Sequence, residues 1–210
     1  MITILIADDH AVVRRGLRQI LEEESDIKVV HEASSGNEAL ELLRRKKVDV
    51  AVLDITMPGK SGLEVLKDLR LEFPKLPVLL LSMHPEDQFA VRALKAGAAG
   101  YLTKEGAPED LVRAIRKVHR GGRFITPSVA ERIADDLSKP AQKQPHEYLS
   151  EREFAVLCLI GRGKSVTEIA DALSLSVKTV STYRSRILQK MNFKTTTALI
   201  QYAVKNRLVE

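Results

Sequence analysis

Five short apolar runs alternate with helix-like patterns over the first 125 residues, and this alternation constrains the fold more than any other feature. The segments between the runs carry apolar residues at helical spacing. The first, third and fourth runs are apolar on both faces, which is typical of parallel strands covered by helices on both sides. We therefore predict a doubly wound (βα)5 sheet, an α/β domain, over residues 1–125. The runs are Ile2–Asp8, Ile27–Ala33, Val48–Asp54, Leu76–Met83 and Ala99–Lys104, and the helical segments are Ala11–Glu23, Gly36–Arg45, Gly62–Phe73, Glu86–Ala96 and Pro108–Arg120.

From Leu149 to the end of the chain, the spacing of apolar residues predicts helices and no strands. Four helix starts have a hydroxyl side chain at the capping position, and the first two also have a glutamate three residues later, as in a capping box. The four are Ser150, Ser165, Ser176 and Thr195. Residues 148–210 therefore predict a second, smaller all-α domain with its own core.

A linker is expected between the two domains, over residues 126–147. A short helix is predicted at Ser128–Leu137. The stretch SKPAQKQPHE follows it, with two prolines, mixed charge and no large apolar residue. Such a composition is typical of an exposed connection.

The net charge of +5 resides in the C-terminal domain. Residues 148–210 hold ten Lys and Arg against five Asp and Glu, whereas the rest of the chain is balanced. A small basic domain after a neutral one indicates an anionic partner, with nucleic acid the first candidate and a solvated basic surface the alternative. The single cysteine, Cys158, excludes an intrachain disulfide, and no apolar run is long enough for a membrane span. We expect a cytoplasmic protein.

Polar side chains follow the predicted strands of the first domain. The first strand ends in Asp8 and Asp9, the third in Asp54, the fourth in Ser82 and the fifth in Lys104. Ligands of open parallel sheets bind at the carboxyl ends of the strands, so these groups are expected to meet at one edge. Any one of these residues could simply cap the end of its strand. Five polar residues at the strand ends of one sheet make that alternative much weaker.

Three carboxylates at one place repel one another and need a cation to stay ionised. Oxygen ligands with room for water suit Mg²⁺. The ion and Lys104 would neutralise the oxygens of a phosphoryl group, and Ser82 would donate a hydrogen bond to it. Asp54, at the centre, is then placed as a nucleophile that forms an acyl phosphate.

The set Asp8-Asp9, Asp54 with Met57-Pro58-Gly59, Ser82 and Lys104 resembles the receiver domain of two-component response regulators, a flavodoxin-like fold. The resemblance implies that Asp54 accepts a phosphoryl group from a histidine kinase and that Lys104 pairs with that group. It also implies that Asp9, Asp54 and the backbone carbonyl of Thr56 bind Mg²⁺, with Asp8 nearby, and that Ser82 and Tyr101 change position with the phosphoryl group. Many receivers have proline after the lysine, where this chain has Glu105.

The segment Val177–Met191 has an apolar face with Val180, Ile187 and Met191, and a polar, basic outer face. A helix and a tight turn precede it, which is the helix-turn-helix pattern, although a solvated amphipathic helix has the same periodicity.

The whole run Leu149–Val209 resembles the LuxR-type helix-turn-helix domain, and the two domains together resemble response regulators of the NarL/FixJ type. On that resemblance Val177–Met191 is the recognition helix. Tyr183 stands where many members have histidine. Base contacts are expected from Ser181, Thr182 and Ser185, and phosphate contacts from Lys178, Thr179, Arg184, Arg186 and Lys190.

The resemblance implies a transcription regulator whose binding to double-stranded DNA is controlled by phosphorylation. A homodimer is expected in the phosphorylated or DNA-bound state, with RNA polymerase as a further partner. The last helix, Thr196–Asn206, is expected to carry the dimer contact. The side chains assigned to that contact are Ala198, Leu199, Tyr202 and Ala203.

Other classes of protein fit less well. An aspartate-nucleophile phosphatase would need a second Asp two residues after Asp54, and Thr56 stands there, so we expect a phosphoryl acceptor and not an enzyme. The run GRGKS, Gly161–Ser165, resembles the end of a nucleotide-binding P-loop, but the glycine that this motif needs five residues before its Gly-Lys is absent, so an NTPase is not expected. A receiver whose C-terminal domain contacts protein and not DNA is a second alternative, but the basic charge of that domain argues against it. His10 and His84 lie beside the acidic cluster, where a histidine could affect the access of water to the acyl phosphate, but we expect them to be solvated loop residues.

Overall fold

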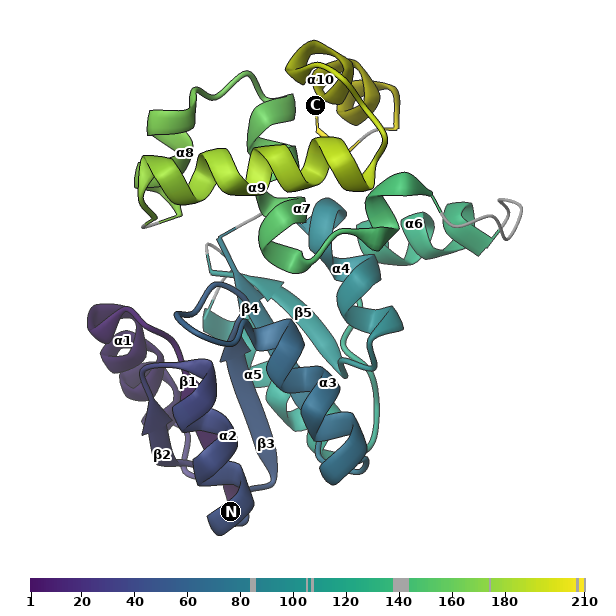
Figure 1. The fold of residues 1–210 in the computed structure, drawn as a ribbon. Helices are drawn as coiled ribbons and strands as arrows, with labels where there is room; N and C mark the ends of the chain where they lie inside the picture. Colours follow the sequence, from purple (N-terminus) through teal and green to yellow (C-terminus); the bar gives the residue numbers. More distant parts are fainter. Residues whose placement is uncertain are drawn as a thin grey trace. The chain divides into compact units, whose positions relative to one another are not determined.

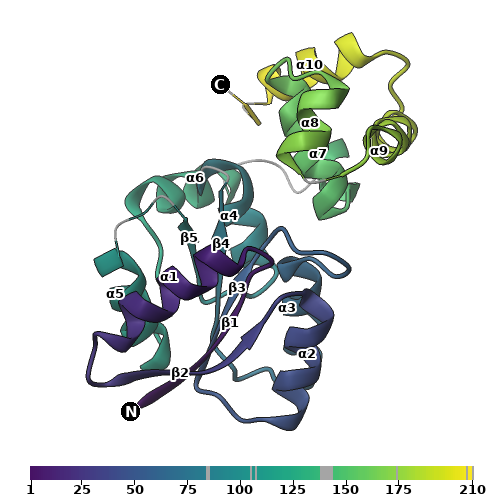
Figure 2. The same cartoon turned by 90° about the vertical axis from the view of Figure 1, so that its left-hand side faces the viewer.

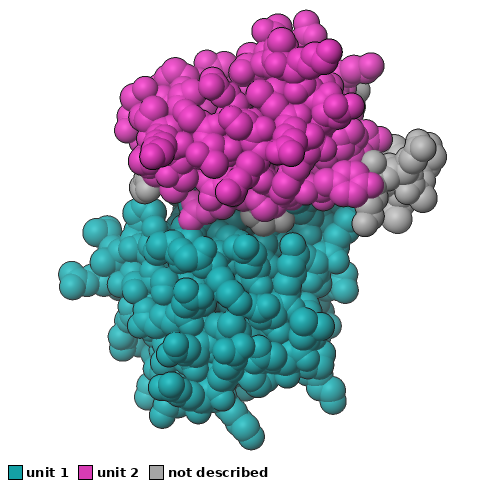
Figure 3. All heavy atoms as spheres, viewed as in Figure 1, with its two compact units in different colours: residues 1–137 teal, residues 138–210 magenta. Residues whose placement is uncertain are grey.

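The structure is a computed structural model, and it describes residues 1–83, 86–104, 106, 108–137, 144–173, 175–206 and 208–209. The chain divides into two compact units, Met1–Leu137 and Ser138–Glu210, which Figure 3 shows in two colours. Each unit has its own core and is described separately.

The first unit is built on a five-stranded parallel sheet with the strand order β2-β1-β3-β4-β5. The predicted (βα)5 fold is confirmed. The order reverses between β1 and β3, so the carboxyl ends of these neighbours form the switch point at which such sheets bind ligands. The strands are β1 (Ile2–Ala7), β2 (Ile27–Ala33), β3 (Val50–Asp54), β4 (Val78–Ser82) and β5 (Gly100–Thr103).

Helices cover both faces of the sheet, which explains why the central strands are apolar throughout. Helices α1 and α5 lie on one face, and α2 and α3 lie on the other (Figures 1 and 2). On the α1/α5 face, Ile4 and Val52 of the strands pack in one core cluster with Ile115 of α5. The helices are α1 (Ala11–Glu22), α2 (Gly36–Arg45), α3 (Gly62–Glu72), α4 (Glu86–Lys95), α5 (Pro108–His119) and α6 (Pro127–Leu137).

The chain after α5 continues as part of the first unit. The backbone N–H of Phe124 donates to the carbonyl of Ala99 at 2.9 Å, and Phe124 forms a bridge with Gly100 at the edge of the sheet. A Cβ on Gly100 would lie 2.9 Å from the carbonyl oxygen of Phe124, so a glycine is needed for this approach. Helix α6, which we expected in the linker, packs against α4. The SKPAQK part of the predicted linker, residues 138–143, lies outside the described residues.

The second unit is helical, as predicted. Its apolar core includes Phe154, Ile169, Val180, Ile187 and Leu199. The predicted capping boxes at the starts of α7 and α8 are present, and hydroxyl side chains cap α9 and α10 as expected. The elements are the 3-10 helix η1 (Pro145–Tyr148) and the helices α7 (Glu151–Gly161), α8 (Val166–Ala172), α9 (Val177–Lys190) and α10 (Thr196–Lys205).

Cys158 is buried in the apolar part of α7. The run GRGKS forms the turn between α7 and α8, where Ser165 caps α8 and Lys164 pairs with Glu168 at 3.0 Å. Among the described residues, no helix is long and apolar enough to cross a membrane.

Candidate functional site

The predicted acidic cluster forms at the switch point of the sheet. Asp8 follows β1 and Asp54 ends β3, and the two strands are neighbours with Ala7 opposite Leu53. This register brings both carboxylates to the same edge, where Asp8 is 0% and Asp54 2% exposed. One ligand atom each from Asp8, Asp9, His10 and Asp54 lies within 4.8 Å of the others.

Lys104 lies among these carboxylates. Its Nζ is 2.6 Å from Oδ2 of Asp8 and 2.9 Å from Oδ2 of Asp54. β4 separates β5 from β3, so a long side chain is needed to reach Asp54 from the end of β5. The backbone N–H of Lys104 donates to the carbonyl of Ser82 at 2.8 Å, which fixes the start of the side chain.

Burial dominates the electrostatics of Asp54. The pKa of its carboxyl is raised from 3.8 to about 6, with removal from water as the largest cause; Lys104 lowers the pKa and the nearby charge of Asp8 raises it. Burial alone would lower the pKa of Lys104, but Asp54 and Asp8 together raise it, so its ammonium stays charged. The site thus keeps a cation fixed beside a carboxylate that is costly to ionise.

The residues present suit a divalent cation. Oδ2 of Asp8 and Oδ2 of Asp54 share the one ammonium of Lys104, and Oδ1 of Asp9 contacts only Nδ1 of His10 at 2.8 Å among the ion pairs of the described residues. When all three carboxyls are ionised, Lys104 balances only one of their charges. Because buried charges need compensation, a divalent ion on these oxygens would complete the balance.

The other predicted site residues gather around this edge. Ser82 ends β4 and is buried, and Tyr101 is buried within β5. The backbone N–H of Thr56 donates a hydrogen bond to the Asp54 carboxylate and favours its ionised form. A Cβ on Gly62 would lie 2.2 Å from the Asp54 carbonyl oxygen, so only glycine lets α3 begin so close to Asp54. His84 and Glu105 lie outside the described residues.

Sequence reasoning missed Arg14 and placed His10 beside the site without assigning it a contact. Arg14 of α1 donates from its guanidinium to the backbone carbonyl of Asp8 at 2.6 Å. His10, expected as a solvated loop residue, has an exposed ring, but Nδ1 lies 2.8 Å from Oδ1 of Asp9. Their positions in the sequence, two and six residues after Asp8, give no periodic signal that separates them from ordinary surface residues.

Helix α9 presents the predicted polar face. Val180 and Ile187 face the core, whereas the expected DNA-contacting side chains are exposed or half-buried. Exposed are Lys178, Thr182, Ser185, Arg186 and Lys190, and half-buried are Thr179, Ser181 and Arg184. A shallow hollow of about 310 Å³ lies on this face, lined by Lys178, Thr179, Thr182, Tyr183 and Arg186.

Hydrogen bonds within the unit already engage several of these groups. Oγ1 of Thr182 donates to the carbonyl of Lys178 at 3.0 Å, and Oγ of Ser185 donates to the carbonyl of Ser181 at 3.1 Å. Both hydroxyls therefore present acceptor lone pairs outward. Nζ of Lys190 pairs with Oε2 of the buried Glu153 at 2.6 Å.

Two of the four residues assigned to a dimer contact on α10 need a correction, whereas Ala198 and Tyr202 are half-buried and their assignment stays a prediction. Leu199 and Ala203 are fully buried in the core of their own unit and are not available to a second chain. The hydroxyl of Tyr202 lies 2.8 Å from Nδ1 of His146 in η1. The helical period placed the apolar residues correctly on one face, but that face packs inward. On the outer face, Val204 is 54% exposed.

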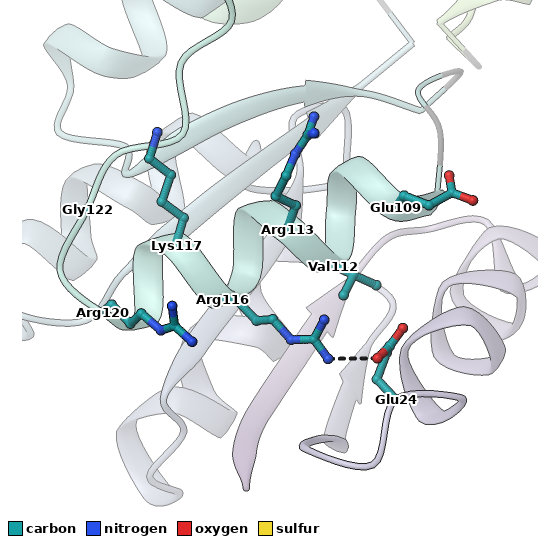
Figure 4. A pocket seen from close by; sticks show the side chains of 8 residues that line it. All are labelled: Glu24, Glu109, Val112, Arg113, Arg116, Lys117, Arg120 and Gly122. Atoms are coloured by element: carbon teal, nitrogen blue, oxygen red, sulfur yellow. Dashed lines mark hydrogen bonds and ion pairs between the residues drawn. The ribbon is translucent and has the colours of Figure 1, made fainter.

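A separate groove of about 710 Å³ lies along α5 (Figure 4). Arg116 points across it to Glu24, with Nη2 2.7 Å from Oε2, and it also pairs with Asp26. None of the residues that line it belongs to the acidic cluster. These residues are Glu24, Glu109, Val112, Arg113, Arg116, Lys117, Arg120 and Gly122.

Comparison with known proteins agrees with this arrangement. Residues 4–116 match the response regulator receiver domain, and residues 147–203 match the bacterial regulatory proteins of the luxR family. The chain therefore belongs to the response regulators of two-component systems, of the NarL/FixJ type with a LuxR-type DNA-binding domain, and it acts in transcription control.

Named relatives extend over the whole chain. It is 39% identical to the response regulator UvrY of Escherichia coli K12, over 99% of this chain and 96% of UvrY. It is also 39% identical to the response regulator GacA of Pseudomonas aeruginosa, over 100% of this chain and 99% of GacA. The run Thr179–Arg184 of α9, TVSTYR, resembles the GacA branch of the family.

Solved structures give the same result. RcsB of Salmonella typhimurium has a TM-score of 0.63 at 29% identity and covers 97% of this chain and 100% of RcsB. RcsB bound to promoter rprA in the presence of the phosphomimetic BeF₃⁻ has a TM-score of 0.61 at 28% identity, over 96% of this chain and 97% of RcsB. A LuxR-family response regulator from Aurantimonas has a TM-score of 0.61 at 36% identity and covers 66% of this chain and 99% of its own.

Proposed function

We propose that Asp54 is the phosphoryl acceptor through which a histidine kinase controls this regulator. The contact between Lys104 and both Asp54 and Asp8 is the observation that supports it most, because it fixes a cation where the oxygens of a phosphoryl group would lie. An oxygen of Asp54 attacks phosphorus, the bond from phosphorus to the kinase imidazole breaks, and the leaving imidazole keeps the electron pair.

Mg²⁺ is the cation that we assign to this site. Asp9, Asp54 and the backbone carbonyl of Thr56 would bind it, with Asp8 beside them, and it would supply positive charge to the phosphoryl oxygens. Lys104 already lies at hydrogen-bonding distance from Asp54. In this account Ser82 donates its hydroxyl to the phosphoryl group, and Tyr101 changes position with Ser82.

The domain boundaries and the second partner also belong to this proposal. We assign residues 1–125 to the receiver and 148–210 to DNA binding. In the DNA-binding domain, α9 enters the major groove with Thr182, Ser181 and Ser185 toward the bases. A homodimer on a two-fold related site and a contact with RNA polymerase remain predictions.

The same site explains why turnover of external substrates is not expected. A phosphatase of this chemistry would need a general acid two residues after Asp54, and Thr56 has no acidic group. Only slow self-dephosphorylation is expected, so the phosphorylated state lasts long enough to act as a signal.

Incubation with acetyl phosphate and Mg²⁺, followed by intact-mass measurement, tests the assignment. The wild type is expected to gain one phosphoryl group, and Asp54→Asn none. Asp49→Asn, a half-buried carboxylate outside the cluster, is the matched control and should gain one phosphoryl group. A phosphoryl group on Asp54→Asn would contradict the assignment.

A further inference from the structure

The turn between β2 and α2 contacts the acidic site from the side of the edge strand. Ala33 is the last residue of β2, and its carbonyl accepts a hydrogen bond of 3.1 Å from the backbone N–H of Asp8. Ala7, the residue before Asp8, lies opposite Ala33 in the sheet. The backbone of one carboxylate of the cluster is therefore fixed by the residue at which this turn begins.

Gly36, the first residue of α2, lies against the loop that follows Asp54. It is buried, and a Cβ on it would lie 2.0 Å from the carbonyl oxygen and 2.9 Å from the carbonyl carbon of Lys60. Carbon atoms at rest in a packed interior are farther apart than this. The carbonyl of Lys60 thus occupies the space that the side chain of any larger residue at position 36 would need.

The same two segments meet again one residue further along α2. Gly59 has a positive φ of 73°, and a Cβ on it would lie 3.0 Å from Nδ2 of Asn37. Residues 36–37 and 59–60 therefore form one interface, in which a glycine from each segment permits the close approach. Helices α2 and α3, which follow these segments, pack side by side (Figures 1 and 2).

The loop that contains Lys60 has little freedom to absorb a displacement. The backbone N–H of Gly62 donates to the carbonyl of Ile55 at 3.0 Å and closes the loop at its base. Between these ends the ring of Pro58 fixes its own φ. A displacement of Lys60 is therefore passed along the backbone of the loop.

Thr56 lies in this loop and serves the site through its backbone. Its N–H donates to the carboxylate of Asp54 and favours the ionised form. Its carbonyl is the backbone ligand that we assign to Mg²⁺. A metal ligand on a loop is only as well placed as the groups that support the loop.

The start of α2 is the stiffer side of this interface. Oγ of Ser35 accepts a hydrogen bond from the N–H of Glu38 at 3.3 Å, and the Glu38 carboxylate accepts from the N–H of Ser34 at 2.7 Å and from its hydroxyl at 2.8 Å. Ala39 and Leu40 then bury the first turns of the helix. The loop, in contrast, is exposed at its middle. Crowding at the interface should therefore move the loop and not the helix.

We propose that the turn over residues 33–37 sets the spacing between Asp8 and Thr56 in the cation site, and that Gly36 is its positioning residue. The turn holds the backbone of Asp8 by a hydrogen bond and supports the loop of Thr56 by direct contact. The proposal deepens the proposed function, on which it rests. It adds a residue that touches neither Mg²⁺ nor the phosphoryl group but fixes the backbone that serves both.

Two matched variants, Gly36→Ala and Gly16→Ala, test this role. Both glycines lie in helices, but a Cβ on Gly16 would meet no atom of the described residues within 4 Å. Gly36→Ala should weaken Mg²⁺ binding, measured by calorimetry, about tenfold, and it should shift the amide resonance of Thr56 in the metal-free protein. Gly16→Ala should bind Mg²⁺ as the wild type does and unfold at the same or a higher Tm.

An unchanged Mg²⁺ affinity in folded Gly36→Ala would overturn the proposal, whatever the effect on Tm. Weaker binding with an unmoved Thr56 amide would overturn it too, because the loop would then not carry the effect. If Gly36→Ala does not fold, Asn37→Ala decides, since that side chain is exposed and its removal crowds nothing. Asn37→Ala should weaken Mg²⁺ binding and shift the Thr56 amide, and an unchanged affinity would overturn the proposal.

Uptake of a phosphoryl group from acetyl phosphate separates this proposal from the proposed function. If the wild type binds Mg²⁺ and gains one phosphoryl group while Gly36→Ala keeps its Mg²⁺ affinity, the role of the turn is wrong and the assignment of Asp54 stands. If the wild type binds Mg²⁺ but gains no phosphoryl group, the assignment of Asp54 alone is contradicted. If the wild type binds no Mg²⁺, both fail.

Discussion

Nζ of Lys104 lies 2.9 Å from Oδ2 of Asp54 and 2.6 Å from Oδ2 of Asp8, so one buried ammonium holds two buried carboxylates. The sheet order makes this possible, because β1 and β3 are neighbours and β5 is one strand beyond β4. The arrangement combines a fixed cation, a carboxylate with a raised pKa and more carboxylates than one ammonium can balance. Such a site costs stability, and that cost can be measured.

Asp54→Asn is expected to stabilise the metal-free first unit at neutral pH. The folded-state pKa of Asp54, about 6, lies above its ordinary value of 3.8, so ionisation opposes folding. The loss of unfolding free energy caused by this ionisation is absent below about pH 4, grows between about pH 4 and 6, and is complete above pH 6. The difference between the two pKa values limits this loss to about 3 kcal/mol. Thermal unfolding should give Asp54→Asn the higher Tm at pH 7.5, with a gap that shrinks at pH 5. Equal Tm values at pH 7.5 would contradict the raised pKa.

Mg²⁺ should stabilise the wild type and not a variant that lacks a proposed ligand. Binding to the folded state alone adds RT ln(1 + [Mg²⁺]/Kd), about 1.4 kcal/mol at ten times Kd. Asp9→Asn should lose most of the rise in Tm. Asp49→Asn serves as the control. A rise in Tm as large in Asp9→Asn as in the wild type would exclude Asp9 as a ligand.

Lys190 is expected to support α9 instead of contacting phosphate, because its ammonium is bound to Glu153. Lys178→Met should reduce the slope of log affinity against log salt by about 1, as loss of a phosphate contact does. Lys190→Met should leave the slope unchanged and lower the stability of the second unit. A reduced slope for Lys190→Met would restore it as a phosphate contact.

Glu153 should make the second unit sensitive to acid. Burial alone would raise the pKa of Glu153, but Lys190 and Ser150 lower it below 4.5. A depressed folded-state pKa gives stability that is present above the unfolded value and is lost as pH falls through the folded one. The unfolding free energies of wild type and Glu153→Gln should therefore differ at pH 7, and the difference should shrink as the pH falls below the ordinary pKa of glutamate. A difference that is constant with pH would rule out this origin.

The two faces of α10 should respond differently to substitution. Leu199→Ala removes a fully buried side chain and should cost about 2 to 4 kcal/mol in unfolding free energy. Val204→Asp, on the exposed face, should leave stability nearly unchanged and weaken any dimer formed through α10. Sedimentation of the DNA-bound protein measures the dimer. Unchanged association in Val204→Asp would place the contact elsewhere.

Much of the fold follows from local patterns in the sequence. Alternating strands and helices predict a parallel sheet because their connections allow little else, and strand-end residues such as Asp54 and Lys104 must then share an edge. Contacts that join distant parts of the chain were not predictable in this way. The pairing of Lys190 with Glu153, and the packing of α6 on α4, depend on how helices meet, and no periodicity records that.

The α10 assignment shows the same limit. Periodicity found its apolar residues but not their partner, and Leu199 and Ala203 serve the core of their own unit. His10 shows a different limit. Its position next to Asp9 in the sequence placed it beside the site, but a lone histidine in a loop has no pattern that predicts its contact of 2.8 Å with Asp9.

The central claim is that phosphorylation of Asp54 controls DNA binding. The most direct measurement is the affinity of the full chain for its operator, with and without acetyl phosphate and Mg²⁺, in wild type and Asp54→Asn at one salt concentration. The account predicts a tighter complex for the phosphorylated wild type and no change for Asp54→Asn. An equal gain in both, or an affinity of the wild type that does not change once intact mass shows a full phosphoryl group, would contradict it.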